Sequence, residues 1–113
     1  MPHTHFEKPE RTSFRTSRTL RSAIEQARRA EGVSLGEVLE IAARRHLRES
    51  RRALARAVRT RDEVHDRTVG VRLSTAGWRL IHGAAVREGL SLADAVEGLL
   101  WIHLAYLERI AKH

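Results

Sequence analysis

The stretch Thr68-Val69-Gly70-Val71-Arg72-Leu73-Ser74 carries the clearest structural signal in the chain. Apolar residues alternate there with small or polar ones, which is the pattern of a short β-strand with one buried face. Ser74 follows at a position suited to a helix N-cap, because its side-chain oxygen can accept a hydrogen bond from a free backbone N–H group. The stretch therefore predicts a strand that leads directly into a helix.

Two helices are expected after this strand. Trp78 and Ile81 recur at helical spacing, and Gly89 can adopt the left-handed conformation that ends a helix. Ser91 and Asp94 have the spacing of a capping box, which predicts the start of a second and more apolar helix. The apolar residues of this second helix are Ala95, Val96, Leu99, Leu100, Trp101, Ile102, Leu104 and Leu107.

The same pattern occurs earlier in the chain. Glu-Gly-Val-Ser-Leu-Gly-Glu at 31–37 recurs as Glu-Gly-Leu-Ser-Leu-Ala-Asp at 88–94, an offset of 57 residues. Without gaps, positions 12–47 lie over positions 69–104, and 11 of the 36 pairs are identical. We interpret this match as an internal duplication. The first copy should therefore also form a strand followed by two helices, with Ser17 as its first cap.

A lone strand is unstable because its backbone N–H and C=O groups need partners. One strand in each copy suggests that the two strands pair antiparallel into a ribbon. The four predicted helices would cover the apolar side of this ribbon, which includes Thr12, Phe14 and Thr16 from the first copy. We therefore expect a mainly α fold with a two-stranded antiparallel β-ribbon. The uncovered side would display Arg11, Ser13, Arg15, Thr68, Gly70 and Arg72.

The composition points to a polyanionic partner. The chain has 113 residues, with 21 Lys and Arg against 14 Asp and Glu, and a formal net charge of +7. Between Arg44 and Arg61 there are eight Arg and one acidic residue. A guanidinium group can make two parallel hydrogen bonds to phosphate or guanine, so an Arg-rich surface favours nucleic acid. Composition alone leaves a solvated helix face, an acidic protein partner and an anionic membrane surface open.

Other functional classes find little support. There is no Cys, so disulfides, thiolate metal sites and cysteine nucleophiles are excluded. No apolar run approaches the ~18 residues of a membrane span, and the first residues lack the apolar segment of a secretory signal. We expect a cytoplasmic, nucleoid-associated protein with no membrane partner. No paired carboxylates, triad spacing or Gly-rich phosphate loop occurs, so we expect no enzyme, no cofactor and no metal site.

The two copies resemble a known family. Val71-Arg72-Leu73-Ser74, followed by Ile81, Gly89 and Ser91, is similar to one unit of the ribbon-helix-helix superfamily of MetJ/Arc type, and residues 15–47 resemble it equally. The usual proline after the strand is replaced by a serine cap in both copies. The resemblance implies two tandem ribbon-helix-helix motifs that form a pseudo-dimer, similar to the single-chain form of conjugation accessory proteins such as TraY.

The resemblance also implies roles for the outward ribbon residues. Arg15 and Arg72 occupy the main base-reading position, where Arg can donate two hydrogen bonds to guanine. Arg11, Ser13 and Thr68 are secondary readers, and Gly70 permits close approach of the backbone. Because the two strands differ on this side, we expect an asymmetric DNA site rather than a perfect palindrome. The N-termini of the second helices would clamp phosphates flanking the ribbon, through Ser34, Leu35, Ser91 and Leu92.

The predicted organisation is a disordered tail over 1–9, a first unit over 10–48, an Arg-rich helical linker over 49–66 and a second unit over 67–113. Auxiliary phosphate contacts are assigned to Arg44, Arg45, Arg48, Arg51 and Arg52. The last helix is apolar on more than one face, so it either thickens the core or offers a self-association surface. The residues of that surface would be Leu100, Trp101, Leu104 and Leu107.

Four further residues are assigned packing roles. His46 and His103 are equivalent positions of the repeat near helix ends, where packing is favoured over metal binding. Gly83 and Gly98 each cost about 1 kcal/mol inside a helix, yet they would permit close approach of another helix.

We therefore expect sequence-specific binding of double-stranded DNA by a β-ribbon in the major groove, with a use as a transcriptional repressor or autoregulator. A plasmid relaxosome or partition accessory protein is an alternative within the same class. From another class, a helical adaptor could bind an acidic partner through the arginines between positions 44 and 61.

Overall fold

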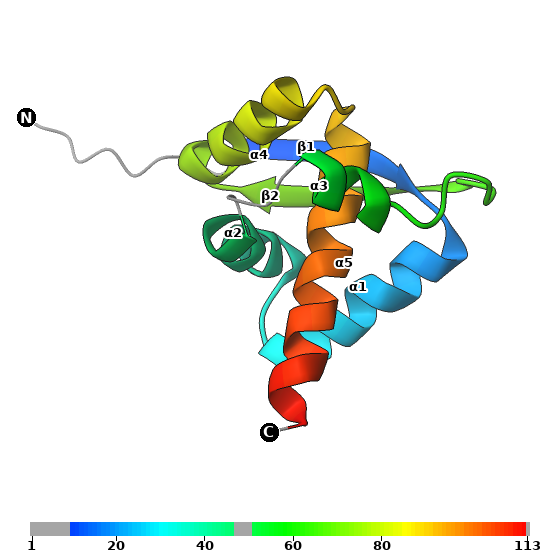
Figure 1. The fold of residues 1–113 in the computed structure, drawn as a ribbon, viewed down its shortest axis with the longest axis vertical. Helices are drawn as coiled ribbons and strands as arrows, with labels where there is room; N and C mark the ends of the chain where they lie inside the picture. The colour runs from blue at the N-terminus through cyan, green and yellow to red at the C-terminus, as the bar shows by residue number, and fades with distance from the viewer. Residues whose placement is uncertain (1–9, 47–50, 113) are drawn as a thin grey trace, which may run out of the picture.

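The computed structural model describes residues 10–46 and 51–112, and the expected tail over 1–9 lies outside this part. Most of the described chain is helical, and its two strands form one antiparallel sheet, as the sequence predicted (Figure 1). In chain order the elements are β1 (Glu10–Thr16), α1 (Arg18–Glu31), α2 (Leu35–His46), α3 (Arg51–Ala57), β2 (Arg67–Leu73), α4 (Thr75–Glu88) and α5 (Leu92–Ala111).

The two strands pair within this one chain. Glu10 lies opposite Leu73 and Thr16 lies opposite Arg67, so all seven residues of each strand are paired. At the centre Ser13 lies opposite Gly70, and these two positions are 57 residues apart, the offset of the sequence repeat.

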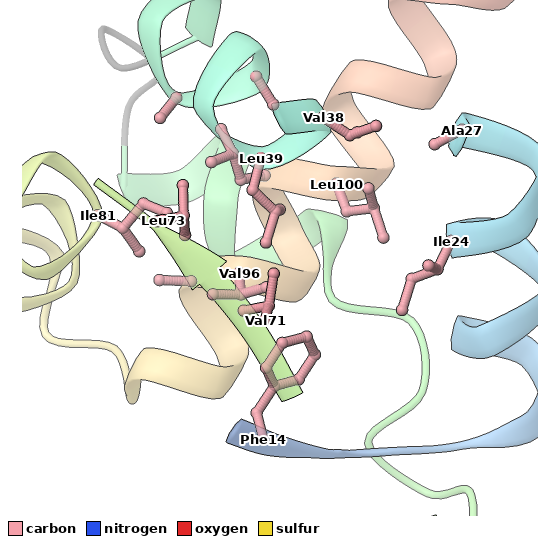
Figure 2. Packing of buried hydrophobic residues seen from close by; sticks show 14 of the residues in the cluster. Phe14, Ile24, Ala27, Val38, Leu39, Val71, Leu73, Ile81, Val96 and Leu100 are labelled. Atoms are coloured by element: carbon pink, nitrogen blue, oxygen red, sulfur yellow. The ribbon is translucent and has the colours of Figure 1, made fainter. Parts of the chain in front are cut away.

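One side of the ribbon is buried against the helices. Phe14, Val71 and Leu73 point into the core, and Figure 2 shows them beside residues of α2 and α5. Thr16 is fully buried as well, and its hydroxyl donates to the carbonyl oxygen of Arg67 at 2.8 Å. A polar residue is therefore tolerated on the inner side because its hydrogen bond is made.

The helix ends follow the sequence signals. Each of the four longer helices begins after a serine whose side-chain oxygen accepts a hydrogen bond from a backbone N–H of the first turn. These serines are Ser17, Ser34, Ser74 and Ser91. Gly32 and Gly89 end α1 and α4 with φ values of 70° and 66°, a conformation that favours glycine.

A buried histidine pair lies where α2 and α5 meet. The His46 Nε2 and His103 Nδ1 atoms share a hydrogen bond of 3.1 Å, and the other ring nitrogen of His103 lies 2.8 Å from a carboxylate oxygen of Glu31. Burial lowers the pKa of His46 below 6.5, and the nearby charges of His103, Arg45 and Arg109 act in the same direction.

The segment between the two halves differs from its expectation. Helix α3 covers Arg51–Ala57, whereas residues 58–66 form a loop that leads into β2 instead of continuing the expected helix. Helix α3 packs closely on α5, because a Cβ atom added at Gly98 would lie 2.5 Å from the carbonyl oxygen of Leu54. Gly98 therefore permits the close approach of another helix, as the sequence predicted.

Two expectations for the helices were wrong. Gly83 is not a site of close helix approach, since a Cβ atom added there would meet open space on the exposed side of α4. Leu100 is 1% exposed and packs in the core beside Val38 and Val96, so it is not part of a self-association surface.

Among the described helices, none is by itself long and apolar enough to cross a bilayer; α4 and α5 meet that test only when taken together, and they are bent by 104° where they join.

The two helical glycines should respond oppositely to alanine. Gly98→Ala should lower the free energy of unfolding by about 1–3 kcal/mol, because the added methyl group overlaps the backbone of α3. Gly83→Ala should raise it by about 0.5–1 kcal/mol, because the methyl group meets no neighbour and alanine favours the helix. Urea denaturation of both variants checks this, and a stabilised Gly98→Ala variant would contradict the packing of α3 on α5.

The stability should also depend on His46. Because its pKa is lowered in the folded state, the unfolded chain binds the proton first as the pH falls through 6.5. The free energy of unfolding should therefore be highest above pH 6.5 and fall below it. His46→Gln should flatten this slope, whereas His82→Gln on the exposed side of α4 should leave it in place. Urea titrations between pH 7.5 and 5 measure both slopes, and equal slopes would rule out the role of the pair.

Candidate nucleic-acid interface

The outward side of the ribbon is exposed along its whole length. Both strands contribute to it, and the alternation of the sequence places its residues together as expected. The six residues are Arg11, Ser13, Arg15, Thr68, Gly70 and Arg72, and every one of them is exposed. Three of the six are arginines and none is acidic, so this surface attracts anions.

Two of the arginines face each other at one end of the ribbon. Arg11 lies directly opposite Arg72, and like charges in this arrangement destabilise a strand pair. The Arg11 side chain lies across Gly70, with its Nε and Nη2 atoms 3.0 Å from where a Cβ atom of residue 70 would stand. Gly70 therefore gives this guanidinium room over the centre of the ribbon.

The other end of the ribbon carries one arginine. Arg15 lies opposite Thr68, and its Nε atom donates to the carbonyl oxygen of His65 at 2.9 Å. Among the described side chains, the guanidinium groups of Arg11 and Arg72 have no such partner. Arg15 is therefore held in place by the loop before β2, whereas Arg11 and Arg72 make no such contact among the described residues.

That loop is fixed by a buried carboxylate. Glu97 of α5 accepts hydrogen bonds from Arg59 N, Thr60 N and Thr60 Oγ1 at 2.7–3.0 Å, and from Trp101 Nε1 at 3.0 Å. Burial alone would raise the pKa of Glu97, but these four bonds together lower it. The Arg59 guanidinium also stacks over the Trp101 ring, 4.9 Å from its centroid.

A second contact joins the end of the loop to α1. Arg21 donates to the backbone carbonyl of Thr16 and to Asp66 Oδ1, at 3.1 and 3.0 Å. The hydrogen bond from Arg21 lowers the pKa of Asp66. Sequence reasoning missed both the Asp66 and the Glu97 contacts. The one signal available was that Glu97 repeats Glu40 at a position inside an apolar helix.

The expected phosphate clamps have the local geometry of helix N-termini. Ser34 and Ser91 are exposed and cap α2 and α5, and Leu35 and Leu92 are partly buried against the core. The first turn of α2 lies against the ribbon, because a Cβ atom at Gly36 would overlap the carbonyl oxygen of Arg72.

The auxiliary arginines are only partly described. Arg44 and Arg45 are exposed in the last turn of α2, where positive charge complements the helix dipole. Arg45 also stacks over Tyr106, 4.8 Å from the ring centroid. Arg48 and the side chains of Arg51 and Arg52 lie outside the described part.

The far end of α5 lies away from the ribbon (Figure 1). Trp101 in the middle of α5, with Leu104 and Leu107 further along, is half-buried, and these residues line a hollow between α1 and α5 together with Gln26. Self-association through these three residues stays a prediction. Within the residues that the structure describes, no group of His, Asp and Glu is arranged to hold a metal ion.

Comparisons of this chain with protein-family models, with curated proteins and with solved structures found no match.

The facing arginines should cost stability in the free protein. Arg11→Gln should raise the free energy of unfolding by about 0.2–1 kcal/mol at low salt, because it removes the repulsion from Arg72. The gain should shrink as salt is added, since ions screen exposed charges. Denaturant titrations at two salt concentrations measure this. Arg79→Gln on α4 controls for net charge, and an equal gain in both variants would contradict a specific repulsion.

Proposed function

We propose that this chain is a ribbon-helix-helix protein that binds double-stranded DNA by placing its ribbon in the major groove. The observation that carries the proposal is the bare outward side of the ribbon, with three exposed arginines and no acidic residue. The major groove admits a two-stranded ribbon, and guanine presents two acceptors that match the guanidinium fork. The repulsion between Arg11 and Arg72 would be relieved by a polyanion lying between or above them.

The tandem arrangement is supported by two symmetric contacts. Ser13 pairs with Gly70 at the centre of the ribbon, and His46 contacts His103 inside the core. Both pairs join residues that are equivalent under the offset of 57. Two such self-equivalent pairs are what a twofold axis from the ribbon through the core would produce. We infer that the two halves of the chain pack as a pseudo-dimer about this axis.

The helix N-termini extend the proposed contact to the DNA backbone. Free N–H groups and the positive dipole end attract phosphates, and the start of α2 lies beside β2 at Gly36. Ser34 and Ser91 would hold phosphates on the two sides of the groove, which positions the ribbon without reading sequence.

We propose repression of transcription as the use of this binding. A protein that occupies an operator stably needs no further activity to block it. A role as an accessory protein on plasmid DNA would use the same interface, whereas an adaptor for an acidic protein would use the arginines between positions 44 and 61.

Removing the two main readers should remove most of the sequence preference. With Arg15→Ala and Arg72→Ala combined, the preference for a selected duplex over a scrambled one should fall roughly tenfold or more, because each guanine contact is worth roughly 1–3 kcal/mol. Residual binding should weaken steeply with salt, since it rests on phosphate contacts. Competition binding at 50 and 200 mM salt measures both effects.

The matched control is Arg44→Gln with Arg45→Gln, which removes the same charge from the exposed end of α2. This variant should keep its preference for the selected duplex. If the parent chain shows no duplex preference for Arg15→Ala and Arg72→Ala to remove, and binding of an acidic protein disappears with Arg44→Gln and Arg45→Gln, the adaptor function replaces the proposed one.

A further inference from the structure

The two ends of the ribbon differ by one side chain. Under the offset of 57, Arg15 is equivalent to Arg72 and Arg11 is equivalent to Thr68. The register places Arg11 opposite Arg72 at one end, which we call the two-arginine end. It places Arg15 opposite Thr68 at the other, the one-arginine end.

The donors available at the two ends also differ. The Arg15 Nε–H group donates a hydrogen bond to the carbonyl oxygen of His65, so the two terminal nitrogens of Arg15 remain available to a ligand. The position of that carbonyl is fixed in turn, because Glu97 holds the start of the loop and Arg21 holds its end at Asp66. Among the described side chains, Arg11 and Arg72 keep all their donors free.

Each end therefore matches a different half-site. Residues directly opposite on a ribbon have Cβ atoms about 5 Å apart, so Arg11 and Arg72 can reach acceptors on neighbouring base pairs. The threonine methyl and hydroxyl groups at the other end suit a thymine methyl group, and Arg15 there suits one guanine.

We propose that this chain binds a non-palindromic duplex in one orientation, set by Arg11 and Thr68. The two-arginine end lies over a half-site with two neighbouring guanines, and the one-arginine end lies over a half-site with one guanine beside a thymine. This inference rests on the proposed function. It assigns the orientation to Arg11 and Thr68, which occupy equivalent positions of the repeat but differ in their side chains.

The test starts from a duplex selected by the full chain from a random library. Two palindromes are then built, one from each half of the selected site. The parent chain should bind the selected site roughly tenfold or more tightly than either palindrome, because one end is mismatched on each palindrome.

Two substitutions should make the ends alike and switch this preference. Thr68→Arg creates arginine pairs at both ends and should favour the palindrome of the two-guanine half. Arg11→Thr leaves one arginine at each end and should favour the other palindrome. Ala105→Arg and Arg109→Thr change the charge equally in the exposed far half of α5, and both should retain the preference of the parent chain.

Orientation can be measured directly because the chain contains no Cys. Asp62→Cys places a single thiol in the exposed loop at the one-arginine end, where an iron chelate can be attached. Radical cleavage of the selected duplex should fall on the side of the one-guanine half. Cleavage of equal strength on both sides would overturn a fixed orientation.

The outcomes separate the two proposals. If the library yields no preferred duplex, the proposed DNA-binding function fails. If it yields a palindrome, or if Thr68→Arg and Arg11→Thr leave the preference unchanged while binding persists, the function stands and the orientation proposal is wrong. Thermal unfolding of each variant shows that the ribbon is intact before binding is compared.

Discussion

The pairing of residues 10–16 with residues 67–73 is the constraint on which this structure depends. A two-stranded ribbon is barely stable alone, so its apolar side must be covered. Phe14, Val71 and Leu73 meet that requirement by packing against α2 and α5 (Figure 2). Covering one side in this way leaves the other side bare, and the same alternation that builds the core therefore presents the arginines.

Local signals predicted much of this fold. The alternation in residues 68–73 marked β2, four serines marked the helix starts, and Gly89 marked the end of α4. Each of these depends on a few neighbouring residues, so a single sequence is sufficient to find them. The same alternation predicted which six residues lie on the outward side of the ribbon, and therefore that this side carries three arginines and no acidic residue.

Contacts between distant segments were beyond such reasoning. Nothing near Glu97 shows that it will meet Thr60, and nothing near Arg15 shows that the loop carbonyl of His65 will bind it. The sequence repeat misleads here, because equivalent residues have different partners. Glu40 accepts from Ser74 at the start of α4, whereas Glu97 holds the loop before β2. Gly83 and Gly98 likewise share a type but differ in their surroundings.

Joining both strands in one chain changes how the ribbon responds to dilution. When the strands of a ribbon belong to separate molecules, the two molecules must associate, and the complex dissociates as the protein concentration falls. Here α3 and the loop over 58–66 keep β2 close to β1. Formation of the ribbon is then a first-order reaction, and the midpoint of its unfolding does not depend on the protein concentration. Even a single molecule therefore retains its complete ribbon.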